Sequence, residues 1–132
     1  MIYTIIILGP PYGTQNSKTG FLFSKALIDS KHVIKKIFFY GEGILNSNIN
    51  LFFNFSPEYT FCNIGKMWKD LSIKYSINLS ICIGSCIKRG FLKNKNTYKK
   101  HYLKKNIASY FHLSNLNDLN ESIISSDRVI QF

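Results

Sequence analysis

The feature that most constrains the fold is an alternation of short apolar runs with longer segments of helical periodicity. The first run, residues 1–8 (MIYTIIIL), is nearly continuous in β-branched and apolar side chains and ends at the turn sequence GPPYGT. This pattern is typical of a buried strand that enters a loop. Residues 15–32 then carry apolar side chains at spacings of three and four, and residues 33–40 (VIKKIFFY) return to a strand pattern. The order predicts a strand–helix–strand unit.

The remaining chain continues this alternation. A long connection without clear periodicity covers residues 41–62, and the lysine-rich segment 94–106 is expected to be helical or irregular at the surface. The other predicted elements are a helix over residues 63–77, a strand over 79–84, a strand over 107–113, a helix over 114–126 and a strand over 127–132. Parallel strands need crossover connections, which these helices provide. The sequence therefore predicts, over residues 1–132, a single three-layer α/β domain with a mainly parallel five-stranded sheet and helices on both faces.

Composition narrows the classes of partner. The chain is 45% hydrophobic and 18% charged, which excludes a disordered polypeptide. Its formal net charge of +10 raises nucleic acid or an anionic surface as a partner. However, the basic residues are 15 Lys and 2 Arg, whereas sites selected to grip phosphate favour the bidentate Arg fork. We therefore interpret the lysines mainly as a solvated surface that reflects biased composition.

The sequence also bears on location and on the common cofactor sites. No stretch approaches the roughly 20 apolar residues that span a bilayer, and residues 1–8 lack the features of an export signal, so we expect a cytoplasmic protein. The loop Gly9–Gly13 matches neither the Walker nor the dinucleotide-binding motif, and its two prolines remove donor amides. The three histidines are scattered relative to the cysteines, which argues against a structural metal site.

Cys82 is the best candidate for chemistry. It falls near the carboxyl end of the predicted strand 79–84, the edge of a parallel sheet where reactive groups collect, and a following helix would favour its thiolate. Lys88 and Arg89 add positive charge nearby. The alternative is that Cys82 and Cys86 are both small buried hydrophobes, a common fate of free cysteine. Helical spacing of four residues would place the two thiols on one face, close enough for sulfur exchange, whereas a rigid strand-to-turn geometry would point them apart.

Several sequence features stand in an order that carries a family resemblance. They are IIILGPPYGTQNS at residues 5–17, FFYGEGILNSN at 38–48, Trp68 in the next helix, LSICIGSCIKRG at 79–90 and SSDRVIQF at 125–132. Together they resemble the DsrE-like family, and within it the TusD-like sulfur carriers, over essentially the whole chain. The combination of GPPYGTQ, IC-x5-RG and DRVIQF is specific, whereas each piece alone is weak.

The resemblance implies a sulfurtransferase in a cytoplasmic relay for tRNA modification. Such carriers assemble with TusB-like and TusC-like chains as a heterohexamer with two copies of each. Sulfur arrives from a TusA-like donor and leaves through a TusE-like acceptor, towards 2-thiolation of the wobble uridine of tRNA. The family's persulfide-bearing cysteine maps onto Cys82, whereas Cys86 and Cys62 inherit no role. Persulfide transfer needs one nucleophilic cysteine and no metal or organic cofactor. The Gly9–Tyr12 loop is expected to form a wall of the crevice.

The sequence leaves two alternative functions open, and two of its segments differ from what the family leads us to expect. The alternatives to a sulfur carrier are a non-catalytic scaffold of the same assembly and a basic protein that binds tRNA directly through its lysines. The lysine-rich segment 93–105 either binds a partner or reflects codon bias. The segment 52–61 is unusually aromatic, and we interpret it either as an apolar surface buried in an oligomer or as a loop folded on its own core.

Overall fold

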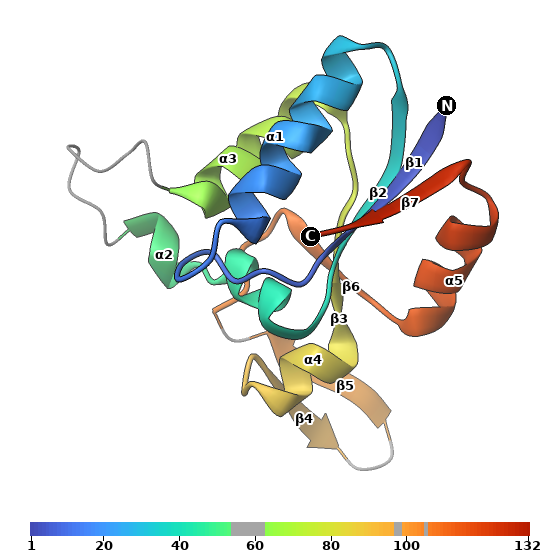
Figure 1. Cartoon of the computed structure of the whole chain (residues 1–132). Coiled ribbons are helices and arrows are strands. Elements are labelled where there is room, and N and C mark those ends of the chain that lie inside the picture. Colours follow the sequence, from blue (N-terminus) through green and yellow to red (C-terminus); the bar gives the residue numbers. More distant parts are fainter. Residues whose placement is uncertain (54–62, 97–98, 105) are drawn as a thin grey trace.

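The centre of the molecule is a sheet of five strands in which every pair is parallel. The computed structural model describes residues 1–53, 63–96, 99–104 and 106–132. The strands are β1 (Ile2–Ile7), β2 (Val33–Phe39), β3 (Leu79–Cys82), β6 (Phe111–Ser114) and β7 (Arg128–Gln131). Their order across the sheet is β6-β3-β2-β1-β7 (Figure 1). β1 and β2 are rich in isoleucine and phenylalanine, as expected for central strands with both faces covered.

Helices cover both faces of this sheet, which confirms the predicted fold class. The helical elements are α1 (Asn16–Asp29), the 3₁₀ helix η1 (Gly41–Ser47), α2 (Asn50–Phe53), α3 (Ile64–Tyr75), α4 (Ile83–Lys88) and α5 (Leu116–Ile124). α1 and α3 lie together on one face, and α5 lies on the other (Figure 1). Within the described residues, no helix combines the length and apolar character needed to cross a bilayer.

The larger part of the core lies between the sheet and the α1–α3 pair. Trp68 of α3 is fully buried, and its ring packs edge-on at 5.3 Å from both Phe21 of α1 and Phe39 of β2. Phe39 in turn meets Phe111 of β6 at 5.2 Å. These aromatic contacts join two helices to two strands. On the opposite face, Phe38 of β2 is also fully buried.

A buried polar network fixes η1 against this core. The Trp68 indole Nε1 donates to Ser17 Oγ at 3.2 Å, and Ser17 Oγ donates to Asn46 Oδ1 at 2.6 Å. The Asn46 amide Nδ2 then donates to the carbonyl oxygens of Gly9 at 3.0 Å and Gly43 at 2.8 Å. The network therefore ties α3, α1, the loop after β1 and η1 together.

Removal of the central hydroxyl of this network should destabilise the protein. We expect Ser17→Ala to lower the free energy of unfolding by about 2 kcal/mol, because it leaves the Trp68 N–H and the Asn46 carbonyl oxygen buried without their partner. Chemical denaturation measures the change. Ser30→Ala, at an exposed position just after α1, is the matched control and should stay within about 0.5 kcal/mol of wild type. Equal stability of both variants would contradict the proposed role of the network.

The lysine-rich segment corrects one prediction. In the part of it that the structure describes, β4 (Leu92–Asn96) and β5 (Lys99–Lys104) pair in antiparallel fashion as a two-stranded sheet of their own. The two strands, LKNKN and KKHYLK, consist mostly of Lys and Asn, so they lack the apolar alternation by which sequence analysis identifies a strand. The preceding residues do form a helix, α4, as expected. The strand predicted over 107–113 begins only at Phe111.

The connection predicted over residues 41–62 is partly helical, because η1 and α2 lie within it. Residues 54–62 are outside the described part of the chain. The interpretations of the aromatic segment 52–61 and of Cys62 therefore stay predictions.

Candidate functional site

Cys82 lies where strand β3 meets helix α4, as the sequence predicted. It is the last residue of β3 and the N-cap of α4, with extended backbone angles (φ −67°, ψ 120°). Leu79 and Ile81 belong to the core on the α1–α3 side of the sheet. Because side chains alternate along a strand, Ser80 and Cys82 face the α5 side. Cys82 is 4% exposed, and its neighbour in β6 is Ser114, directly before α5.

A cavity of about 350 Å³ contains Cys82. Its described lining comes from the end of β2, from the β3–α4 segment and from the start of α5: Tyr40, Gly41, Cys82, Gly84, Ser85, Lys88, Arg89 and Leu116. Gly84 carries no side chain, and a Cβ at this position would lie 3.9 Å from Cys82 Sγ. One side of the thiol thus faces a residue that occupies little space. The cavity is large enough to admit a reacting group from another molecule.

Helix α4 is tied to the start of η1 by two sets of contacts. The Gly41 N–H donates to Ser85 Oγ at 3.0 Å. Arg89 donates from Nε at 3.0 Å and from Nη2 at 2.7 Å to Glu42 Oε1. Its Nη1 also donates to the Ser85 carbonyl oxygen at 3.4 Å. These contacts hold two walls of the cavity together.

The two basic residues that the sequence placed near Cys82 both line the cavity, but they differ in their partners. Arg89 forms an ion pair with Glu42, so its charge is largely balanced. Lys88, in the last turn of α4, has no acidic partner among the described residues. Lys88 is therefore the cation at this cavity whose charge is not neutralised by a contacting carboxylate.

Cys86 has a different environment from Cys82. It is fully buried, packs within the core on the α1–α3 side, and is absent from the described lining of the Cys82 cavity. Burial raises the pKa of the Cys86 thiol to about 12, and the nearby Cys82 charge adds to this effect, while Arg89 opposes it. Both thiols are free. Cys86 behaves as a small buried hydrophobe, and its thiolate is scarce at neutral pH.

The Gly9–Tyr12 loop is not a wall of the Cys82 cavity, contrary to expectation. It leads into a separate cavity of about 210 Å³, whose described lining runs from Pro11 to Lys18 and includes Ile64 and Met67 of α3. β2 lies between β1 and β3 in the sheet, and η1 follows β2 directly. The loop after β1 therefore contacts α3 and η1, although it starts at the same edge of the sheet as Cys82.

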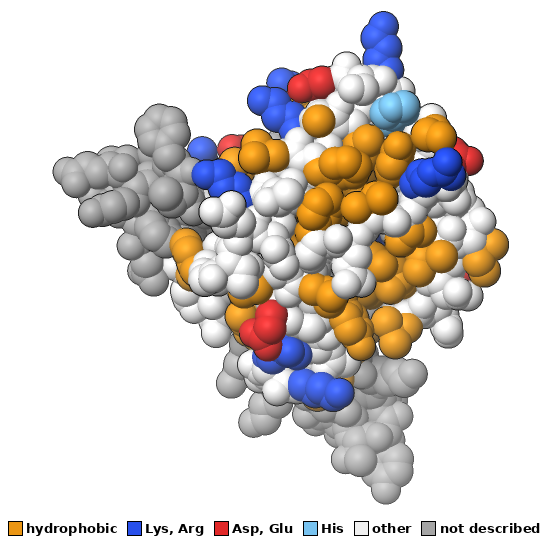
Figure 2. Space-filling view, viewed as in Figure 1, with side chains coloured by type: hydrophobic (Ala, Val, Ile, Leu, Met, Phe, Trp, Pro, Cys, Tyr) orange, Lys and Arg blue, Asp and Glu red, His pale blue; other side chains and the backbone are white. Residues whose placement is uncertain are grey.

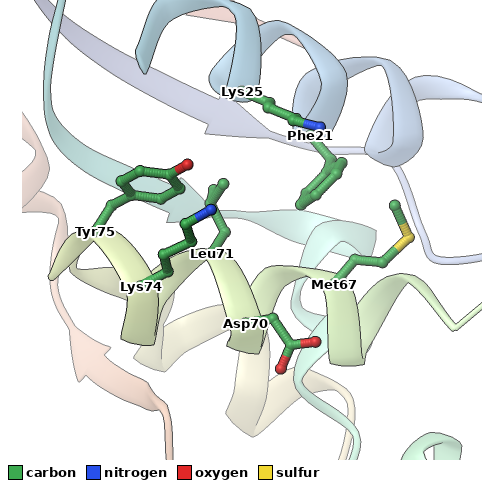
Figure 3. A pocket seen from close by; sticks show the side chains of 7 residues that line it. All are labelled: Phe21, Lys25, Met67, Asp70, Leu71, Lys74 and Tyr75. Carbon is green, nitrogen blue, oxygen red and sulfur yellow. The ribbon is translucent and has the colours of Figure 1, made fainter. Parts of the chain in front are cut away.

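A further cavity of about 210 Å³ lies between α1 and α3 (Figure 3). Its described lining is Phe21, Lys25, Met67, Asp70, Leu71, Lys74 and Tyr75, a mainly apolar floor with charged side chains at its margin. This described lining includes no cysteine. Among the described residues, no three His, Cys, Asp or Glu side chains gather closely enough to hold a metal ion. Of these three cavities, only the one at the end of β3 has a cysteine in its described lining.

Sequence analysis missed four residues that shape the Cys82 cavity: Tyr40, Glu42, Ser85 and Leu116. Two signals for them were present. Ser85 of α4 and Arg89, its C-cap, are four residues apart, and the FFYGEG segment contains the end of β2, at the sheet edge where Cys82 lies. The Arg89–Glu42 contact joins residues 47 positions apart, and such a contact leaves no local pattern.

The fold and the site together define a class of protein: a parallel α/β domain in which, among the described residues, a cysteine at a strand end lines a cavity and is suited to thiol chemistry. Comparison with known proteins narrows this class to one family. The profile of the DsrE/DsrF-like family matches residues 1–132. Sulfurtransferase TusD of Buchnera aphidicola subsp. Baizongia pistaciae is 40% identical over 134 residues, with all of both chains covered. Sulfurtransferase TusD of Proteus mirabilis is 34% identical over 132 residues, covering 100% of this chain and 98% of the relative.

A solved structure agrees with this assignment at the level of the fold. The crystal structure of the ychN protein from E. coli superposes with a TM-score of 0.73 at 17% identity and covers 100% of both chains. The chain belongs to the DsrE/DsrF-like family. The resemblance found in the sequence is thereby confirmed, and the expected sulfurtransferase class agrees with the names of the relatives.

Proposed function

We propose that the chain is a sulfurtransferase that carries sulfur as a persulfide on Cys82. One observation carries the assignment of the residue: Cys82 ends β3 inside a cavity, whereas the thiol of Cys86 is sealed in the core. The names of the relatives support the reaction class. Cys62 lies outside the described residues.

The proposed step is a thiolate displacement that needs no change of oxidation state overall. The Cys82 thiolate attacks the outer sulfur of a donor persulfide, R–S–SH. A bond forms between Cys82 Sγ and that sulfur, the donor S–S bond breaks, and R–S⁻ leaves. The products are Cys82–S–SH and the donor thiolate. In the second transfer an acceptor thiolate attacks the outer sulfur, and Cys82 leaves as its thiolate.

We place this carrier in a cytoplasmic sulfur relay, following the family resemblance. The proposed donor is TusA-like and the proposed acceptor TusE-like, and the sulfur is destined for the 2-thiolation of the wobble uridine of tRNA. The proposed assembly contains TusB-like and TusC-like chains, two copies of each subunit. The mass of the mixed subunits by light scattering, compared with that of the isolated chain, tests the assembly.

The site assignment is tested by mass spectrometry of the protein loaded with sulfur. Wild type, Cys82→Ser and Cys86→Ser are incubated with cysteine, a cysteine desulfurase, the donor and the partner chains. We expect a gain of one sulfur that maps to Cys82, disappears in Cys82→Ser and persists in Cys86→Ser. A sulfur that maps to Cys86 would overturn the assignment.

A scaffold role is the first competing function. In that case Cys82→Ser would leave sulfur transfer through the assembled complex unchanged, whereas a carrier role predicts its loss. The experiment needs a variant that still assembles, and the small change from thiol to hydroxyl at the end of β3 is suited to that purpose.

Direct binding of tRNA is the second competing function, and the net charge of +10 raises it. Figure 2 shows hydrophobic side chains across the middle of one face, with Lys and Arg side chains of the described residues at separate places around them. This face offers no continuous basic stripe in the part of the chain that the structure describes. Binding of tRNA that weakens steeply with salt would favour an electrostatic contact.

A further inference from the structure

The geometry points to Lys88 as the residue by which the Cys82 cavity selects an anionic sulfur reactant. This inference rests on the proposed function for its biological meaning, but its physical basis is the charge distribution around the cavity. Lys88 and Cys82 line the same space of about 350 Å³. The other lining side chains with polar atoms are Tyr40, Ser85 and Arg89.

Arg89 is unsuited to this role because Glu42 engages it. Two of its nitrogens donate to a single carboxylate oxygen, at 3.0 and 2.7 Å, and a third donates to the Ser85 carbonyl. To bind an anion with the same groups, Arg89 would have to give up these contacts. Together Arg89 and Glu42 present almost no net charge, and their contact holds α4 against η1. We therefore assign Arg89 and Glu42 to positioning.

Lys88 has the opposite properties. It is exposed in the last turn of α4, and within the described residues no carboxylate lies at ion-pair distance from it. Its flexible side chain can place a compact positive charge over the cavity without breaking an existing contact. Asp118, the acidic residue in the first turn of α5, accepts from Ser114 Oγ at 2.8 Å and from the Asn115 N–H at 3.3 Å.

The chemistry of transfer gives this cation a function at every stage. Whether a thiolate attacks R–S–SH or a thiol exchanges with R–S–S⁻, one negative charge resides on sulfur before, during and after the step. A cation at the cavity favours entry of the anionic reactant and offsets the negative charge as it moves between sulfurs. Because Lys88 is exposed, we expect a modest effect of about fivefold, as for solvent-screened charge pairs.

The test compares two reagents of similar size and different charge. Iodoacetate is an anion and iodoacetamide is neutral, and both alkylate a thiolate with loss of iodide. Rate constants for Cys82 are measured by peptide mass spectrometry in wild type, Lys88→Gln, Lys88→Arg and Lys25→Gln. Lys25 is a matched control because it is also an exposed helical lysine at a cavity margin, but that cavity has no cysteine (Figure 3).

We expect the ratio of the iodoacetate rate to the iodoacetamide rate to fall about fivefold in Lys88→Gln. The ratio should be unchanged in Lys25→Gln and restored in Lys88→Arg. Added salt should lower the ratio more in wild type than in Lys88→Gln. An unchanged ratio in Lys88→Gln would overturn the proposal. This includes the case in which both rates fall equally, because that result reports a change in the thiol or in the fold.

This outcome is separable from that of the proposed function. A lower ratio in Lys88→Gln, together with no persulfide on wild-type Cys82, would leave anion selection standing and reject the carrier role. Conversely, a persulfide on Cys82 with an unchanged ratio would leave the carrier role standing and reject the role of Lys88.

Discussion

Iodoacetamide at about pH 7.5 should alkylate Cys82 at least about a thousandfold faster than Cys86. The thiolate is the reacting species, and burial raises the pKa of Cys86 to about 12. Only roughly three in 100,000 Cys86 thiols are then ionised at that pH, about a thousandfold fewer than if the pKa of Cys86 had its ordinary value of 9.0. Cys86 is also fully buried in the core, which blocks the reagent, whereas Cys82 is 4% exposed and lines a cavity of about 350 Å³.

Timed alkylation followed by peptide mass spectrometry measures the two rates separately, and the peptide with Cys62 is scored on its own. The control is the same protein in denaturant, where both thiols should react within a few-fold of each other because burial is lost. The rate at Cys86 in the native protein should rise about tenfold for each added pH unit until the pKa is approached. Comparable native rates at the two cysteines would remove the structural basis for assigning the sulfur to Cys82.

The sequence could place Cys82 because the evidence for it was local. An apolar run that ends in SIC and is followed by helical spacing locates a thiol at a strand end, and the order of elements makes the sheet parallel. The helices predicted over 15–32 and 63–77 were equally local, and α1 and α3 lie within these ranges. Apolar periodicity over several helical turns reflects which side of a helix is buried, so local sequence is enough to predict such helices. The structure confirms both.

The contrast between the two cysteines was beyond the sequence. Their spacing suggested one helical face, but Cys82 has extended backbone and only caps α4, so the helical spacing rule does not apply to it. Its side chain follows the alternation of β3 towards α5, whereas Cys86 turns towards the opposite core. The Arg89–Glu42 pair was hidden for a related reason, because it depends on how η1 meets α4 in space.

Gly43→Ala should lower the free energy of unfolding by about 3 kcal/mol or more, a larger loss than in Ser17→Ala. This corresponds to a fall in melting temperature of about 10 °C. A Cβ at this position would lie 1.9 Å from the Ile7 carbonyl oxygen and 2.8 Å from the Ile7 carbonyl carbon. Both atoms are backbone at the end of β1, so no side-chain rotation can relieve the clash. η1 must move away from the sheet, although the Ile7 oxygen accepts from the Tyr40 N–H at 3.0 Å and the Gly43 oxygen accepts from Asn46.

Gly84→Ala is the matched control, because its Cβ would meet only Cys82 Sγ at 3.9 Å, an ordinary contact. Its free energy of unfolding should lie within about 1 kcal/mol of the wild-type value, since alanine is favoured over glycine inside a helix. Thermal unfolding of both variants measures the difference, and a melting temperature of Gly43→Ala within about 2 °C of wild type would contradict the close approach of η1 to β1. Because η1 also carries Gly41 and Glu42, any displacement of it reaches the walls of the Cys82 cavity. A Gly43→Ala protein that still folds should therefore load sulfur more slowly, even though Gly43 does not line that cavity.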